Sequence, residues 1–304
     1  YAARIYDEAV ACWEKSVSID DTYPTVLRNL SLAYYNKQNN PQKALVTLEK
    51  AYKLDESDAR ILMELDQLYK KLRYSHRDRL DFLNAHAEVV EQRDDLCIER
   101  ITLYNQLGEY QTAYDLINSR KFHPWEGGEG KVTSQYVLCR VELAKIALKE
   151  ARYADAVRLL KETEKYPDNL GEGKLSMAEE NDIHYWLGCA YEGLGESELA
   201  KEYFVRATKG SAEPAIAFFY NDQQPDKIFY QGLAWRKLGE EDKARSRFNK
   251  LIKHGEQHLF DKVKIDYFAV SLPDLLIWDD DLNVRNLIHC NLVMGLGYLG
   301  LGDK

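Results

Sequence analysis

Two stretches of the sequence repeat one pattern and decide the fold. Leu187–Gly210 reads LGCAYEGLGESELAKEYFVRATKG, and Gln231–Ile252 reads QGLAWRKLGEEDKARSRFNKLI. In both, a glycine precedes an aromatic residue by three positions, a Leu-Gly-Glu turn follows, and an alanine then precedes a phenylalanine by four positions. Apolar residues at three- and four-residue steps form one buried helical stripe, and a turn glycine can end a helix in the left-handed conformation. The pattern therefore predicts a helical hairpin in each stretch.

The same pattern recurs along most of the chain. Met294–Lys304 (MGLGYLGLGDK) repeats its first half, and further copies are marked by the alanine that opens the second helix. These alanines are Ala9, Ala44, Ala113, Ala156, Ala200 and Ala244. A small side chain there lets two helices pack closely. Self-similarity at a fixed period is typical of solenoids, so the sequence predicts an all-α superhelical solenoid of antiparallel helix pairs, with about seven full or partial repeats.

The spacing of these alanines divides the predicted solenoid. The first two are 35 residues apart, whereas the last four follow one another at 43 or 44 residues. We therefore expect a single solenoid over residues 1–304, with near-standard repeats at 1–118 and extended repeats with loop insertions at 119–304. The pattern begins inside one repeat and stops inside another, so we expect a fragment of a longer protein.

Composition limits the classes of function. The chain has 304 residues, of which 45% are hydrophobic and 30% charged, and its net charge is -9. An acidic chain repels phosphate backbones, so we expect no nucleic-acid partner. No stretch reaches the ~20 apolar residues that cross a bilayer, so we expect no membrane partner. Five single, dispersed cysteines are typical of reduced thiols, which favours a cytoplasmic location.

The hairpin signature resembles the tetratricopeptide repeat (TPR) family. Two further segments, Phe122–Gly130 (FHPWEGGEG) and Asp266–Pro273 (DYFAVSLP), are followed by the acidic run Asp279–Asp281. Together they resemble the C-terminal repeat region of large bacterial proteins with an uncharacterised β-rich N-terminal domain. This resemblance implies a link to carbohydrate metabolism, and it transfers no functional residue to this chain.

Insertions interrupt the repeat at places where helix packing does not account for the residues. Insertions of successive repeats tend to emerge on one face, and three of them carry aromatic side chains beside acidic or amide ones, which suits a peptide or a hydroxyl-rich ligand. The alternative is that these aromatics pack against neighbouring repeats and the polar residues cap helices. A fourth interruption, at 166–173, is interpreted as a plain connection. The predicted ligand or partner surface comprises Trp125, Glu126, Glu129, Tyr220, Asn221, Asp222, Tyr267, Trp278 and Asp279.

No set of residues indicates catalysis. His254 and His258 are four positions apart, as zinc ligands can be, but a solvated helix end accounts for them better. Arg28 stands where some tetratricopeptide domains grip a C-terminal carboxylate. Leu32 replaces the asparagine that such a clamp needs, and Glu64 occupies the matching place in the next unit. We therefore expect a protein that is not an enzyme, with no cofactor and no metal site.

These observations predict a protein–protein interaction or intramolecular scaffold segment of a larger bacterial protein, which binds through the solenoid surface and the insertion loops. The expected partners are the protein's own N-terminal domain, a second copy or another protein, with carbohydrate as the non-protein candidate. The alternative function is an accessory part of a carbohydrate-processing enzyme whose catalytic domain lies outside this chain.

Overall fold

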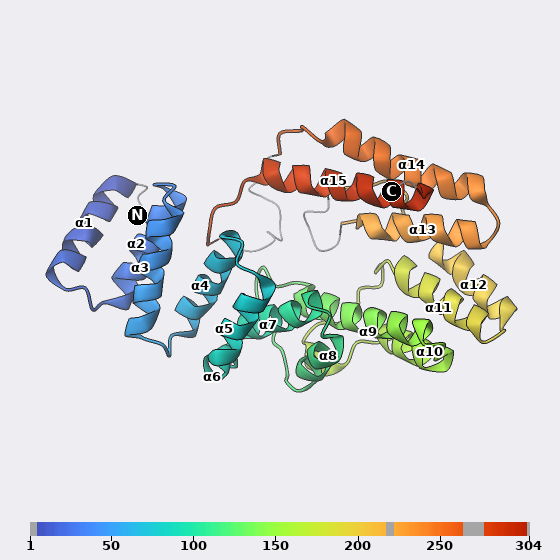
Figure 1. Cartoon of the computed structure of the whole chain (residues 1–304), viewed down its shortest axis with the longest axis horizontal. Helices are drawn as coiled ribbons and strands as arrows, with labels where there is room; N and C mark the ends of the chain where they lie inside the picture. The colour runs from blue at the N-terminus through green and yellow to red at the C-terminus, as the bar shows by residue number, and fades with distance from the viewer. Residues whose placement is uncertain (1–4, 217–221, 264–276, 303–304) are drawn as a thin grey trace. The chain divides into compact units, whose positions relative to one another are not determined.

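The computed structural model describes residues 5–216, 222–263 and 277–302. Over these residues the chain is all-α, with helices joined mostly by short turns and no strand. Its internal contacts divide it into two compact units (Figure 1). Unit 1 comprises Tyr1–Glu109 and Leu275–Asp280, and unit 2 comprises Tyr110–Asp274 and Asp281–Lys304. None of the described helices has the length and apolar character needed to span a bilayer.

Unit 1 contains the first seven helices. They are α1 (Tyr6–Ile19), α2 (Pro24–Asn36), α3 (Pro41–Leu54), α4 (Ala59–Lys71), α5 (His76–Ala85), α6 (Ala87–Val90) and α7 (Asp94–Gln106). Polar side chains fix where several of them begin, since an N-cap oxygen accepts a hydrogen bond from a backbone N–H that the helix leaves unpaired. Asn40 caps α3, Asp58 caps α4 and Ser75 caps α5 in this way.

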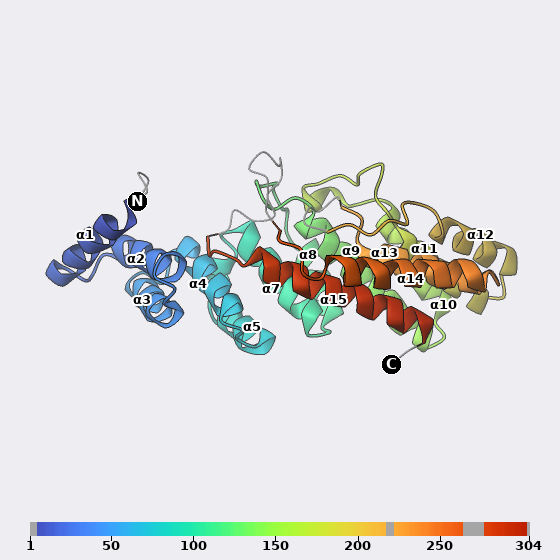
Figure 2. The same ribbon diagram turned by 90° about the horizontal axis from the view of Figure 1, so that it is seen from above.

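Unit 2 contains the remaining helices. They are α8 (Tyr110–Asn118), α9 (Lys131–Lys149), α10 (Tyr153–Lys161), the short 3-10 helices η1 (Glu162–Glu164) and η2 (Asp168–Leu170), α11 (Asn181–Gly193), α12 (Ser197–Ala207), α13 (Pro225–Lys237), α14 (Glu241–His258) and α15 (Leu282–Leu301). Six of these helices form three hairpins (α9 with α10, α11 with α12, and α13 with α14). Helices α13, α14 and α15 lie side by side (Figures 1 and 2).

Close packing within each hairpin follows the predicted columns. Five of the six repeat alanines are buried, the exception being the half-buried Ala9. The ring of Phe204 rests on Gly188 so closely that a Cβ there would lie 2.5 Å from the ring, and Phe248 covers Gly232 in the same way at 2.3 Å. These contacts confirm the predicted all-α fold built from TPR-like helical hairpins. The expectation of a single solenoid divided at residue 118 stays a prediction.

The turns confirm the role assigned to glycine and extend it. Gly195 and Gly239 adopt φ angles of 79° and 80°, the left-handed conformation expected after a first helix. Arg73 and Ala151 take the corresponding conformation, with φ angles of 62° and 56°, although each carries a side chain. The turn geometry is therefore maintained even where the Leu-Gly signature is missing.

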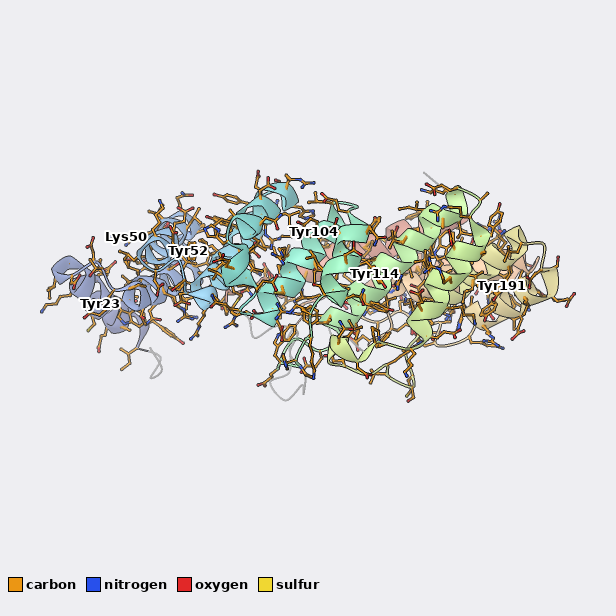
Figure 3. The ribbon with its side chains drawn as sticks, turned by 90° about the horizontal axis from the view of Figure 1, so that it is seen from below. Tyr23, Lys50, Tyr52, Tyr104, Tyr114 and Tyr191 are labelled. Atoms are coloured by element: carbon orange, nitrogen blue, oxygen red, sulfur yellow. The ribbon has the colours of Figure 1, made fainter. Side chains whose placement is uncertain are left out.

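The repeat places Tyr34, Tyr69, Tyr104, Tyr191 and Tyr298 in one column, and a stripe at helical spacing in a solenoid predicts packing between helices. Tyr34 is buried. Tyr104 and Tyr191 are labelled in Figure 3. Tyr104 accepts a hydrogen bond from Asn84 at 3.0 Å, and Tyr191 stacks on Tyr203 with ring centroids 5.3 Å apart. Tyr298 differs, because it is 41% exposed. The interpretation of this column as core is therefore wrong for Tyr298.

Candidate functional site

The candidate site lies in unit 1, where a short stretch from far along the chain contacts two helices. We call this stretch, Ile277–Asp280, the strap. It precedes α15 in sequence and lies beside α4 (Figure 1). We call the surface that holds it the strap site, which comprises Tyr35, Asn36, Lys37, Glu64 and Lys71.

Helical periodicity brings the residues of the strap site together. Helices α2 and α4 are the first helices of two successive hairpins. Arg28 and Asn36 are eight residues apart, so they lie on one face of α2, and Glu64 and Lys71 are seven apart on one face of α4. Each helix therefore presents one polar face toward the strap.

The side-chain amide of Asn36 recognises the main chain of the strap. Its Nδ2 donates to the carbonyl oxygen of Ile277 at 2.8 Å, and its Oδ1 accepts from the N–H of Asp279 at 2.8 Å. An amide is suited to this because it carries a donor and an acceptor on one planar group. The two bonds lie on either side of Trp278 and fix its position along the site. Both hydrogen bonds go to backbone atoms of the strap, so they do not depend on its side chains, and any extended segment could form them.

Trp278 is the anchor of the strap. Only 1% of the residue is exposed, and its indole N–H donates to the backbone carbonyl of Glu64 at 3.0 Å. Tyr35 meets the indole edge-on, with ring centroids 5.2 Å apart. A buried tryptophan contributes a large apolar area and needs a partner for its N–H. The strap site supplies both the apolar surroundings and the acceptor.

Two lysines face the two acidic residues that come after the anchor. Lys37 lies 3.7 Å from Asp279, and Lys71 lies 2.9 Å from Asp280. Burial, and then the charges of Asp280 and Asp279, raise the pKa of Tyr35. Partly exposed ion pairs of this kind contribute only about 0–1 kcal/mol each. The indole and the main-chain hydrogen bonds therefore contribute most to holding the strap in place, and the two ion pairs contribute less.

Glu64 links the strap site to the helices beneath it. Its carboxylate is fully buried and accepts hydrogen bonds from Arg28 at 2.6 Å and from Arg60 at 3.2 Å. Removing a cation from a buried carboxylate is costly, so the Arg28–Glu64 pair links α2 to α4, while the Arg60–Glu64 pair lies within α4. Arg28 is thus engaged inside unit 1.

Two residues of the predicted ligand surface, Trp278 and Asp279, belong to the strap. Trp278 is buried against α2 and α4, so its ring is not open to a ligand while the strap is seated. The other half of the site was not predicted from the sequence. In the sequence, Asn36 and Lys37 have the residue types of an ordinary helix end and turn. Lys71 has that of a solvent-exposed helix end.

The first insertion, in unit 2, is held by the segment at 166–173. The N–H of buried Phe122 donates to the carbonyl of Asn169 at 2.7 Å, and the N–H of Gly130 donates to Glu172 at 2.9 Å. The Asn169 side chain also donates to two carbonyls at the end of α8 and just after it. The segment at 166–173 therefore anchors the preceding loop as well as joining two helices, and its interpretation as a plain connection stays a prediction.

Acidic residues gather on this anchored loop beside its tryptophan. The ring of Trp125 covers Gly128, where a Cβ would lie 2.0 Å from the indole. Burial raises the pKa of Glu172, and the charge of Glu129 raises it further. Glu126 is exposed. The ring of Trp125 therefore lies in the same short loop as the carboxylates of Glu126 and Glu129.

The remaining predicted residues divide between described and undescribed parts of the chain. Asp222 is half-buried in unit 2. Tyr220, Asn221 and Tyr267 lie outside the described residues, so a shared loop surface stays a prediction. Over the described residues, no three histidine, cysteine or carboxylate side chains gather as metal ligands would.

Comparisons with known proteins place the repeats within a family. Residues 182–211 and residues 228–254 each match a model described as tetratricopeptide repeat. The first match covers most of α11 and all of α12, and the second covers most of α13 and α14.

Solved structures similar to this chain include three repeat proteins. A tetratricopeptide repeat protein from Parabacteroides merdae is 16% identical over 81% of this chain and 85% of that one, with a TM-score of 0.43. YrrB, a TPR protein with an unusual peptide-binding site, is 16% identical over 64% and 90%, with a TM-score of 0.41. PilW, a type IV pilus biogenesis factor, is 13% identical over 76% and 92%, with a TM-score of 0.41. The family matches show that this chain carries tetratricopeptide repeats at residues 182–211 and 228–254.

Proposed function

We propose that this chain is a protein-interaction scaffold whose unit 1 binds an extended peptide segment at the strap site. The observation that carries the proposal is the pair of hydrogen bonds between the Asn36 amide and the strap main chain. Helical-repeat proteins build their binding surfaces from successive repeats, and here α2 and α4 supply such a surface. Main-chain bonds give affinity for any extended segment, and a pocket for one side chain adds specificity.

The proposed setting is a larger bacterial protein in the cytoplasm, in which this chain has no catalytic role. Its partner is then the protein's own N-terminal domain, a second copy or another protein. The five cysteines lie singly and dispersed along the sequence, which supports a reducing compartment. Knowledge of the full-length gene tests this setting, because catalytic carboxylates in an N-terminal part would favour the carbohydrate-processing alternative.

A second candidate function is carbohydrate binding by the anchored loop around Trp125. The observation that favours it is the tryptophan beside Glu126 and Glu129 on a loop that Asn169 and Glu172 hold in place. A screen of glycans and peptides against the wild-type chain and Trp125→Ala tests this idea. Loss of one class of ligand in the variant is expected, and equal binding by both chains contradicts it.

A variant whose strap no longer occupies the strap site tests the proposed peptide binding by unit 1. Trp278→Ala removes the anchor of the strap, and the probe is a fluorescein-labelled peptide with the sequence of Leu275–Leu282, LLIWDDDL. Fluorescence anisotropy should show binding of this peptide to the Trp278→Ala chain. Adding Asn36→Ala should weaken binding about 5- to 150-fold, because two hydrogen bonds worth ~1 kcal/mol or more each are lost.

The matched control for Asn36→Ala is Asn118→Ala. Asn118 also ends a helix, and its amide donates only to a carbonyl of its own helix, that of Tyr114, at 2.7 Å. Circular dichroism confirms that each variant is folded. Equal affinities of the Asn36→Ala and Asn118→Ala chains, or no binding by a folded Trp278→Ala chain, would contradict the proposed function.

A further inference from the structure

We infer that the strap is a tethered competitor and that unit 1 exchanges it for a segment of a partner protein. In that segment a tryptophan is followed by two acidic residues in an extended chain. The inference rests on the proposed peptide-binding function and adds the chemistry of the partner and the regulation of the site. Three observations carry it: the register of the contacts, the charges around them and the kind of groups that make them.

The contacts specify three consecutive residues. The Asn36 amide binds the carbonyl before Trp278 and the N–H after it, so the register of the main chain is fixed. The indole N–H then meets the carbonyl of Glu64 at 3.0 Å. Phenylalanine is smaller than tryptophan and has no N–H, so it would lose this hydrogen bond and leave part of the space unfilled. Tryptophan is therefore the side chain that fits this position.

The charges specify the two residues after the tryptophan. These positions of the strap face Lys37 and Lys71, with closest charged atoms 3.7 and 2.9 Å apart. Opposite charges across an interface raise the association rate and penalise like-charged partners. A segment with lysine or arginine at these positions would meet two cations. The partner is therefore acidic after its tryptophan.

The strap contacts unit 1 in a way that a separate peptide could reproduce. Residues 277–280 form neither helix nor strand, and Trp278 is the only one of the four that is buried. Asp279 is 60% exposed at its side chain. The receiving groups are side chains of α2 and α4, the side chain of Lys37 just after α2, and one carbonyl of α4. The backbone hydrogen bonds that build an α-helix run within the helix itself. Exchange of one extended segment for another leaves these helices intact.

Because the strap is part of the same chain, it lowers the apparent affinity of the site for a partner segment. A segment that belongs to the same chain as its site has an effective concentration there on the order of 1 mM. If the empty site binds a free segment at about 10 μM, the seated strap weakens the apparent affinity about 100-fold. A partner with the same three residues alone therefore binds weakly. Additional contacts, or presentation at high local concentration, allow it to displace the strap.

The test compares 304-residue chains with and without a competent strap. The probe is the labelled LLIWDDDL peptide, titrated into wild type, Trp278→Ala and the double variant Asp279→Asn/Asp280→Asn. We expect at least tenfold weaker binding by wild type than by Trp278→Ala, with the double variant in between. Equal, measurable binding by wild type and Trp278→Ala would overturn the competitor role and leave the proposed function intact. Binding by none of the chains would contradict the proposed function itself.

A charge exchange tests the partner chemistry. In the Trp278→Ala chain, Lys71→Glu should weaken binding of LLIWDDDL several-fold, and a peptide with lysine in place of Asp280 should restore it to within about threefold, since the ion pair is re-formed with reversed signs. A lysine peptide that binds no better than LLIWDDDL to the Lys71→Glu chain would overturn the acidic specificity.

Analytical ultracentrifugation tests the tether, because a wild-type dimer that Trp278→Ala abolishes would show that the strap binds a second copy instead.

Discussion

Two glycines in one column of the repeat predict opposite responses to the same substitution. A Cβ added to Gly188 would lie 2.5 Å from Cδ1 and Cε1 of Phe204, a residue that is 3% exposed. A Cβ added to Gly295 meets no atom within 4 Å. Both glycines lie inside helices, α11 and α15. The two alanine variants therefore differ only in whether the added methyl group has room.

The expected magnitudes follow from two effects. Alanine in place of glycine stabilises a helix interior by about 1 kcal/mol, and this gain applies at both positions. Forcing a methyl group against a buried ring costs about 1–3 kcal/mol, and this cost applies only at Gly188. We therefore expect Gly295→Ala to stabilise unit 2 by about 1 kcal/mol and Gly188→Ala to leave it up to about 2 kcal/mol less stable than wild type.

Thermal unfolding followed by circular dichroism measures the difference. For a unit of this size, 1 kcal/mol corresponds to roughly 2–4 °C, so the two midpoints should differ by about 2–12 °C. Urea unfolding gives the same comparison as a free energy. Equal midpoints for the two variants, or a Gly188→Ala chain more stable than the Gly295→Ala chain, would refute the packing of Phe204 on the first helix of its hairpin.

Three further perturbations test other parts of the fold. Arg79→Met should destabilise unit 1 by about 3–5 kcal/mol, because it leaves the buried carboxylate of Asp66 without the guanidinium that binds both its oxygens at 3.0 and 2.6 Å. Urea unfolding checks this against Arg77→Met, which removes an exposed guanidinium, and equal losses would contradict it. Ala151→Gly should stabilise unit 2 by about 1 kcal/mol, because Ala151 adopts a φ of 56°, which glycine tolerates freely; an unchanged or lower thermal midpoint would count against it. Burial lowers the pKa of the His184 imidazole in the folded chain. The unfolded chain therefore binds a proton at His184 more readily than the folded chain does. Acidification through the ordinary histidine pKa of ~6.5 consequently lowers the free energy of unfolding. Unfolding at pH 7.5 and 5.5 should show a smaller acid-induced loss for His184→Gln than for wild type, and identical losses would show that His184 is not the cause.

The hairpins could be predicted because their determinants are local. Ala200 and Phe204 reveal the second helix of a hairpin through their four-residue spacing, and Gly195 reveals the turn before it. The structure confirms both, with Phe204 packed on Gly188 and Gly195 in the left-handed conformation. Turns without glycine were harder to recognise, since nothing in the identity of Ala151 indicates a positive φ.

The strap site could not be predicted, because its two halves are far apart in sequence. Asn36 and Asp279 are 243 residues apart, and no periodicity relates a helix end to a distant extended stretch. The sequence singled out Trp278 correctly as a break in the repeat. It could not show that the indole would be buried in unit 1 and bonded to a carbonyl of Glu64. Backbone acceptors leave no mark in the residue types of a sequence.

The anchored loop illustrates a second limit. Asn169 and Glu172 read as ordinary turn residues, because asparagine and acidic residues are common wherever the chain reverses. Only the structure shows that they hold Phe122 and Gly130 of the preceding insertion. Tertiary hydrogen bonds of this kind depend on which loops meet, and that is set by the packing of whole hairpins.

Amide hydrogen exchange of the strap tests the central claim most directly. Asp279 is exposed at its side chain, yet its N–H donates to Asn36 at 2.8 Å, so its amide should exchange slowly only if the strap is seated. Mass spectrometry of the segment Ile277–Asp280 in the 304-residue chain should show protection in wild type and in Asn118→Ala, and fast exchange in Asn36→Ala. Equally fast exchange in all three chains, or protection that survives Asn36→Ala, would contradict the seating of the strap on α2.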